Sequence, residues 1–275
     1  MSYSVKIILD SINDNNQRLT TIEATYPRII HSELMTHRVM SRNAASSRAI
    51  PVKKILEKVL TDPFVPSYWG QNQSGMQASN VLNQEEQNLA IKEWLAARDS
   101  AYEHASKLAN NLNVHKQLAN RILEPFSWIT VIITATDWQN FFKLRCNPAS
   151  QPEFQTLANM IKLEFKNSNP KFLKNDEWHL PYIYSEDLII EKNIEELKKI
   201  STARCARVSY LTHDGKRDHN KDLELHNRLL SEGHMSPFEH IARPAKINEN
   251  NLMGNFRGWI QYRKLIPNES AQELN

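Results

Sequence analysis

The segment from residue 36 to residue 48, THRVMSRNAASSR, concentrates side chains that bind anions. It holds three arginines, one histidine, three serines, one threonine and one asparagine, and no Asp or Glu occurs between Leu34 and Leu56. Guanidinium groups form paired hydrogen bonds with phosphate, and hydroxyl groups add further donors. The segment therefore indicates a phosphate site, although a solvated loop whose arginines stabilise a helix end explains it equally well.

Three further residues carry groups that suit a nucleotide-like ligand. Asn140 and Arg145 lie five positions apart on a helix that we expect over residues 137 to 145, and Arg121 lies near the end of another expected helix. At about 100° per residue, the side chains of Asn140 and Arg145 diverge by about 140°, so one helix could contact two ligands. The alternative is an exposed arginine and a surface or capping asparagine.

Two histidines and a glutamate in GHMSPFEH, residues 233 to 240, raise the question of a metal site. Their spacing matches neither H-E-x-x-H nor H-x-x-E-H, so we expect no metal. Ser236, followed by Pro237 and Glu239, is instead typical of a capping box at the start of a short helix.

Composition excludes several classes of protein. Only six of the 275 residues are glycine, and none is spaced as G-x-G-x-x-G or G-x-x-x-x-G-K-[ST], so a Rossmann fingerprint and a Walker A loop are both excluded. Two cysteines exclude a disulfide framework and a four-thiolate zinc site. The net charge of +3 gives no support to nucleic-acid binding, and no segment is typical of a signal peptide or a membrane span. We therefore expect a cytoplasmic protein that binds neither nucleic acid nor a membrane.

The elements that must position these side chains indicate an α+β fold. Residues 5 to 9 and 18 to 26 predict a hairpin around the turn at 13 to 16, and residues 128 to 135 predict a further strand. Residues 167 to 182 are typical of an irregular connection. Apolar periodicity predicts helices over residues 29–38, 83–112, 114–123, 137–145, 153–165, 185–199 and 222–232, with a last strand near 240–247. We expect one catalytic domain spanning residues 1–275, with the candidate site residues in 1–165 and 200–250.

The same motifs resemble the flavin-dependent thymidylate synthases, the ThyX family. The family signature, R-H-R-x7-S, extends to R-H-R-x-x-S-x-N-E-x-S-x-R, and residues 36 to 48 follow its register. Thr36 stands in place of the first arginine and Ala44 in place of the glutamate. Residues 117 to 125 resemble the family's A-R-x-x-L-P segment, and residues 140 to 153 resemble its N-F-L-x-L-R…Q-x-E segment.

Two further segments resemble the family but stand in a different order. ARVSY, residues 206 to 210, and GHMSPFEH, residues 233 to 240, resemble segments that precede the signature in the family and follow it here. The chain therefore resembles a circularly permuted, divergent member. Proteins tolerate such a rearrangement when their termini lie close together at the surface.

The resemblance implies a ThyX-like fold, with an antiparallel or mixed sheet and long helices, and the reductive methylation of dUMP to dTMP using FAD, NADPH and methylenetetrahydrofolate. It implies that reduced flavin supplies the hydride without a cysteine nucleophile, and that a homotetramer shares its active sites between subunits. Arg145 matches the catalytic arginine that favours ionisation of the uracil imide. The motifs further imply dUMP contacts through Ser46, Ser47, Arg48, Arg121 and Arg145, and FAD contacts through His37, Arg38, Asn140, His234 and Ser236.

Departures from the signature leave other functions open. Besides Thr36 and Ala44, Glu33 stands where the family has a glutamine near the nucleotide, and residues 134–136 replace its flavin-binding N-x-R. An enzyme of this family that transfers the one-carbon unit without reducing it would give a 5-hydroxymethylpyrimidine nucleotide from dUMP or dCMP. A non-catalytic nucleotide-binding homologue is a further alternative.

Overall fold

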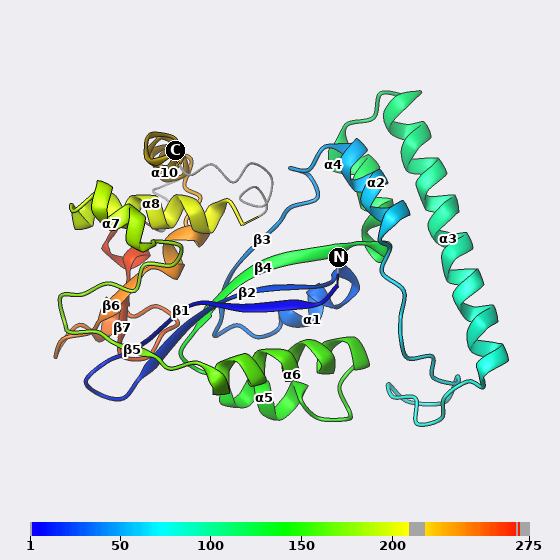
Figure 1. Cartoon of the computed structure of the whole chain (residues 1–275), viewed down its shortest axis with the longest axis horizontal. Coiled ribbons are helices and arrows are strands. Elements are labelled where there is room, and N and C mark those ends of the chain that lie inside the picture. Colours follow the sequence, from blue (N-terminus) through cyan, green and yellow to red (C-terminus); the bar gives the residue numbers. More distant parts are fainter. Residues whose placement is uncertain (1, 209–217, 268, 270–275) are drawn as a thin grey trace, which may run out of the picture.

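A five-stranded mixed sheet forms the centre of the chain in the computed structural model, which describes residues 2–208, 218–267 and 269 (Figure 1). The strand order is β3-β4-β2-β1-β5. Only β1 and β5 pair in parallel, whereas the other neighbours in this sheet are antiparallel. The strands are β1 Ser4–Ile12, β2 Arg18–Pro27, β3 Ser41–Ala44, β4 Trp128–Ala135 and β5 Lys171–Phe172. Together with the helices described below, this sheet confirms the α+β fold class.

The predicted N-terminal hairpin is confirmed as β1 and β2. The side-chain oxygen of Asn13 accepts hydrogen bonds from the backbone N–H groups of Asn15 and Gln17 and so closes the turn. Asn16 adopts a left-handed φ of 56°, a conformation that asparagine tolerates better than most residues.

Strand β4 is buried on both faces, which explains its continuous apolar sequence. Val131 and Ile133 pack in one core with residues of α5, Gln139–Arg145, and α6, Pro152–Asn167. Ile132 points to the opposite face and packs with Phe238 and other residues near the C-terminus. Because successive side chains of a strand alternate between its faces, β4 joins two hydrophobic cores.

The signature segment starts in a turn and then enters the sheet. The helix expected over residues 29–38 is shorter: η1 covers Arg28–Ile30 and α1 covers His31–Leu34. Residues 41–44 then form β3, which pairs antiparallel with residues 131–134 of β4. The sheet edge thereby fixes the middle of the signature segment.

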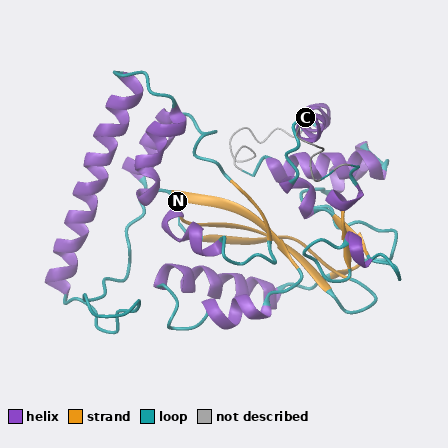
Figure 2. Cartoon of the chain, turned by 180° about the vertical axis from the view of Figure 1, so that it is seen from behind, coloured by secondary structure: helices purple, strands orange, loops and turns teal. Residues whose placement is uncertain are grey.

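A group of helices lies to one side of the sheet. Within this group α3 lies farthest from the sheet, as both views show (Figures 1 and 2). The prediction for residues 83–112 is confirmed by α3, Gln84–Asn110, which begins with a capping box between Asn83 and Glu86. Ala105 is its one fully buried residue, although Trp94 and Tyr102 pack partly against the neighbouring helices. The others are α2 Val52–Thr61, α4 Lys116–Ala119 and η2 Asn120–Phe126, so the single helix expected over residues 114–123 is divided in two.

The remaining helices and two short strands form a C-terminal region. Its elements are α7 Ser185–Ile190, α8 Ile194–Ala206, α10 His219–Ser231, η3 Ser236–His240, β6 Ala242–Pro244, η4 Asn250–Leu252, β7 Trp259–Gln261 and η5 Tyr262–Leu265. The single helix predicted over residues 185–199 is wrong, because the chain leaves the helix after residue 190 and the Asn193 side chain caps a new one. The last expected strand is also shorter, since β6 covers three residues.

The predicted capping box in residues 233 to 240 is wrong as well. Met235, not Ser236, occupies the N-cap of η3, and no side chain caps it. The Ser236 hydroxyl donates to Asn43, and the Glu239 carboxylate accepts from Arg263. Both side chains therefore serve tertiary contacts that local spacing does not reveal.

Buried polar side chains connect the sheet to the C-terminal region. The His179 ring bonds Ser11 and Thr21, Thr21 bonds Thr134, and Thr134 bonds His240, all at 2.7–2.8 Å. Burial lowers the pKa of His179 and that of His240 to about 3, so both rings are neutral near pH 7. In the described residues, no helix is long and apolar enough to cross a membrane.

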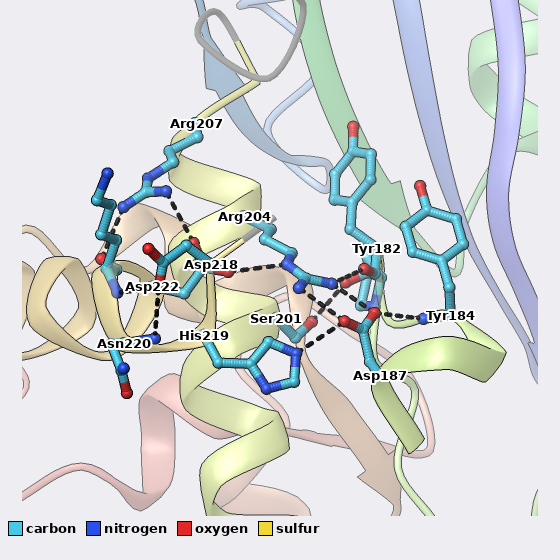
Figure 3. Close-up of polar contacts among 12 residues, drawn as sticks. Tyr182, Tyr184, Asp187, Ser201, Arg204, Arg207, Asp218, His219, Asn220 and Asp222 are labelled. Atoms are coloured by element: carbon cyan, nitrogen blue, oxygen red, sulfur yellow. Dashed lines mark hydrogen bonds and ion pairs between the residues drawn. The ribbon is translucent and has the colours of Figure 1, made fainter. Parts of the chain in front are cut away.

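An ion-pair network holds the C-terminal helices together (Figure 3). The Arg204 guanidinium on α8 donates to both carboxylate oxygens of Asp187 and, at 2.9 Å, to Asp222 on α10. Arg207 also pairs with Asp222, and His219 contacts Asp187, each at 2.9 Å. Arg207 belongs to the ARVSY segment, of which residues 209 and 210 lie outside the described residues.

Candidate functional site

Arg145, at the last position of α5, contacts the first two residues of the signature and Glu33, which precedes them. Its Nε donates to His37 Nε2 and its Nη1 to Glu33 Oε2, both at 2.9 Å, while Nη2 donates to the Thr36 hydroxyl at 3.3 Å. The guanidinium also lies over the Phe154 ring, 4.5 Å from its centroid. Two sequence segments predicted to carry chemistry therefore meet in the folded chain.

His37 is held as a neutral acceptor for this arginine. Its ring is buried and meets Phe141 and Phe154 edge to face. Burial, together with the positive charges of Arg145 and Arg42, lowers the pKa of His37 to about 4. Because Arg145 Nε can only donate, His37 Nε2 carries no proton, and the ring proton resides on Nδ1.

A second group of predicted residues surrounds Glu124. Its Oε1 accepts from the Ser47 hydroxyl at 2.7 Å and from Arg121 at 2.9 Å, and it pairs with Arg28 at 3.0 Å. The Asn120 side chain donates to the Ser47 carbonyl at 2.7 Å and fixes the loop. No motif in the sequence singled out Glu124 or Arg28 as a candidate site residue.

A third group joins the signature to residues 200–250. The Ser236 hydroxyl donates to Asn43 Oδ1 at 3.2 Å, and Asn43 Nδ2 donates to the Cys205 carbonyl at 2.9 Å. His234 lies two residues away, is largely exposed, and contacts Glu232 at 3.3 Å. The segment that follows the signature in this chain thus packs directly against it.

These three groups remain separate within one chain. Between them the described residues form no direct hydrogen bond, although each includes a residue from positions 36–48. Of the other predicted site residues, four are exposed at the surface: Arg38, Ser46, Arg48 and Asn140. One chain therefore gathers Arg145 with His37, and Ser47 with Arg121, and leaves the predicted FAD set dispersed.

A cleft of about 720 Å³ opens beside Arg145. Glu33 and Arg145 line it together with Tyr68, Trp69 and Trp94. The last three were not predicted as site residues, because Tyr68 and Trp69 belong to no motif and Trp94 lies within the helix expected over residues 83–112. The paired aromatic residues at 68 and 69, within a stretch rich in Gln and Ser, were the signal that could have identified them. Among the described residues, no group of His, Cys, Asp or Glu side chains is arranged to hold a metal ion.

Comparison with known proteins places these segments in a family. The model of the family described as "Thymidylate synthase complementing protein" matches residues 18–171. The crystal structure of a UMP/dUMP methylase, PolB from Streptomyces cacaoi bound with 5-Br UMP, is similar with a TM-score of 0.49 and 15% sequence identity, covering 60% of this chain and 89% of that chain. No curated protein matches.

The family match extends over more than half of the chain and includes the signature, Arg121, Asn140 and Arg145. It confirms the resemblance found in the motifs, whereas residues 200–250 lie outside the matched range. The chain belongs to the thymidylate synthase complementing protein family.

Proposed function

We propose that this protein is an FAD-dependent thymidylate synthase, which converts dUMP into dTMP with methylenetetrahydrofolate as one-carbon donor and NADPH as reductant. The family match supports a role in thymidylate synthesis. The observation that carries the proposal is the position of Arg145 at the wall of a cleft, bonded to His37 of the signature at 2.9 Å.

Arg145 can stabilise negative charge on a pyrimidine ring. A guanidinium keeps its own charge at any physiological pH, so beside the uracil imide it favours the anionic form that makes C5 nucleophilic. The neutral His37 ring fixes the guanidinium through Nε without cancelling its charge. A base in the cleft would replace the Glu33 or Thr36 contact on the two terminal nitrogens.

The dUMP phosphate has suitable donors in the second group. Ser46, Arg48 and Arg121 present exposed hydroxyl and guanidinium groups. Ser47 is buried and already bonded to Glu124, which also accepts from Arg121. A phosphate would take the place of this carboxylate as the partner of Arg121, because both are anions that a guanidinium binds in the same way.

The exposed donors of the predicted FAD set fit a phosphate-containing flavin. Arg38 and Asn140 are exposed, and guanidinium and amide groups suit phosphates and ring carbonyls. Ser236 and His234 add a hydroxyl and an imidazole, whereas His37 Nε2 is already engaged by Arg145. When bound, the flavin would supply the hydride that reduces the transferred one-carbon unit.

Neither cysteine suits a nucleophile that would replace the flavin route. Burial raises the pKa of the Cys205 thiol, which is fully buried, and also that of Cys146. A thiol whose pKa is raised carries little thiolate near pH 7. Both cysteines therefore favour a mechanism without an enzyme thiolate.

The separation of the three groups within one chain supports sites that are shared between subunits, and we propose a homotetramer as the assembly. Light scattering of the purified protein measures the assembly directly. Mixing inactive Arg145→Ala subunits with inactive Ser46→Ala subunits tests sharing, because a site built from two chains regains one intact copy in mixed assemblies. Recovered activity supports shared sites, and a monomer without recovery contradicts them.

The visible absorbance spectrum of the purified protein, incubated with FAD and then with NADPH, tests the function. The expected result is bleaching of bound flavin that accelerates with dUMP and, once methylenetetrahydrofolate is added as one-carbon donor, a product with the mass of dTMP. A product heavier by one oxygen identifies the hydroxymethylase alternative, for which dCMP is the second substrate to test. Failure to bind FAD at all contradicts the proposal and favours the non-catalytic homologue.

A further inference from the structure

The segment between α2 and α3 forms a fixed wall opposite Arg145. Its two arms pair through backbone hydrogen bonds from Gln71 to Asn80 and from Leu82 to Trp69, at 2.8 and 2.9 Å. The Tyr68 hydroxyl donates to the Ala78 carbonyl at 2.7 Å and crosses the same pair of arms. The wall is therefore held by its own backbone.

Packing against α3 sets the orientation of the Trp69 ring. It meets the Trp94 ring edge to face, with centroids 6.2 Å apart and an interplanar angle of 78°. Trp94 is itself fixed, because its Nε1 donates to the Phe64 carbonyl at 2.8 Å. An aromatic ring held in this way costs little further conformational entropy when a ligand stacks on it.

The cleft in front of this wall has the size of a small-molecule site. Its volume of about 720 Å³ lies within the usual range of roughly 300–1,000 Å³ for such sites. Arg145 and Glu33 close it on one side, and Ser150 lies on the loop that follows α5. The cleft thus combines aromatic surface with a permanent positive charge.

Two buried polar atoms at this cleft have no partner. Trp69 Nε1 and the Ser150 hydroxyl form no hydrogen bond with any other described residue, and both residues line the cleft. The carboxylates nearby are engaged, since Glu33 accepts from Arg145 and Glu153 accepts from Gln151. A buried donor without an acceptor is unfavourable, so these two atoms mark where a ligand should accept hydrogen bonds.

We propose that the cleft between Arg145 and Trp69 binds a planar heteroaromatic ring bearing carbonyl acceptors, stacked on the aromatic wall and bonded to Trp69 Nε1 and Ser150. Trp69 supplies both surface and a donor, while Arg145 binds the same ring at another edge. The identity of the ring rests on the proposed function, which offers three sources of this chemistry: the pyrimidine of dUMP, the isoalloxazine of FAD and the pterin of a reduced folate.

Calorimetric titration with dUMP, FAD and tetrahydrofolate, each added separately, distinguishes the sources. For the ligand that occupies the cleft, Trp69→Ala should raise the Kd about 10- to 100-fold, because it removes stacking and a donor. Trp69→Phe and Ser150→Ala each remove one hydrogen bond and should raise the same Kd about three- to tenfold. The matched control is Trp178→Phe, since Trp178 packs against Tyr262 in the C-terminal region.

Circular dichroism establishes that each variant folds, and the two milder variants keep the test valid if Trp69→Ala does not. A Kd unchanged by Trp69→Phe and Ser150→Ala for all three ligands overturns the inference, as does wild-type protein that binds none of them. Turnover of dUMP that is insensitive to Trp69 leaves the proposed function standing and refutes the cleft. Ring binding that depends on Trp69, without any turnover of dUMP, supports the cleft and contradicts the proposed function.

Discussion

Arg145 and Arg204 each form several hydrogen bonds within the chain, but their surroundings differ. The Arg204 side chain is 1% exposed and pairs with two carboxylates on neighbouring helices (Figure 3). The Arg145 side chain is 20% exposed and lines a cleft. It bonds one carboxylate, that of Glu33, and two neutral acceptors, His37 and Thr36. Neutral acceptors at a solvent-facing edge are readily exchanged for those of a ligand, whereas a buried charge and its partners have no substitute. This contrast favours a structural role for Arg204 and supports the catalytic role that we propose for Arg145.

The largest expected effect is on stability, at Arg204. Arg204→Ala leaves Asp187 and Asp222 with less compensation in a buried region and should lower the free energy of unfolding by about 3–5 kcal/mol. Denaturant titration measures the loss. The control is Arg243→Ala, which removes a more exposed pair with Glu249 and should cost about 1 kcal/mol or less. Equal losses of unfolding free energy in the two variants would contradict a special structural role for Arg204.

Arg145→Ala should show the opposite profile. Turnover should fall about 100- to 1,000-fold, as when a group that stabilises developing charge is lost, while the free energy of unfolding changes by about 1 kcal/mol or less. Steady-state kinetics and denaturant titration on one preparation measure both. A loss of stability as large as that of Arg204→Ala would make Arg145 a structural residue.

Acid should separate the two networks. His37 has a folded pKa of about 4 against an ordinary value of 6.5, so the unfolded chain takes up a proton that the folded chain refuses between these pH values. Neutral His37 therefore makes its full contribution to the free energy of unfolding above pH 6.5, and this contribution falls as the pH drops towards 4. The loss is at most about 3 kcal/mol, because the unfolded and folded pKa values differ by 6.5 − 4 = 2.5.

Asp187 behaves differently. Burial alone would raise the pKa of this carboxyl, but the hydrogen bonds from Arg204 and His219 hold it below its ordinary value of 3.8. Its contribution is complete above pH 3.8 and is lost only at lower pH. NMR titration of the His37 ring checks the order of events: protonation near pH 4 should break the bond to Arg145 while Arg204 remains paired. Protonation of His37 near pH 6.5 would contradict this order.

The smallest expected effect concerns Glu33. Glu33→Gln introduces the residue type that the resemblance to the family implies at this position and removes the charge that partly neutralises Arg145. We expect the KM for dUMP to fall about two- to fivefold, with a stability change within about 0.5 kcal/mol. The double variant Glu33→Gln with Arg145→Ala is the control, in which the gain should vanish. A rise in KM would show that the carboxylate itself binds the substrate.

Local patterns predicted much of the fold. The hairpin, β4 and α3 follow from turn residues, a β-branched run and apolar periodicity, all of which operate within a few residues. The break after residue 190 escaped prediction because the amphipathic pattern continues through it. The capping box at Ser236 failed because Asn43, nearly two hundred residues away in sequence, offers the hydroxyl a tertiary partner.

The candidate site divides in the same way. The register of the motifs identified Arg145 and His37, and in the folded chain their side chains form a direct hydrogen bond. Glu124 was not found, because its role depends on Arg28 and Ser47 converging from separate segments. Trp69 was not found either. It belongs to a loop without periodicity, and only the folded chain brings it to the wall of the cleft.

The paired arms next to Trp69 also limit how this sequence can vary. A Cβ added at Gly70 would lie 2.2 Å from the Ala78 Cβ, closer than two carbon atoms can approach. No rotamer relieves such a clash, because both atoms are fixed to the backbone. In a saturation library selected for growth without thymidine, position 70 should tolerate glycine alone, even though glycine has no side chain that could bind a ligand. Mutational intolerance there would report the shape of the wall, not chemistry.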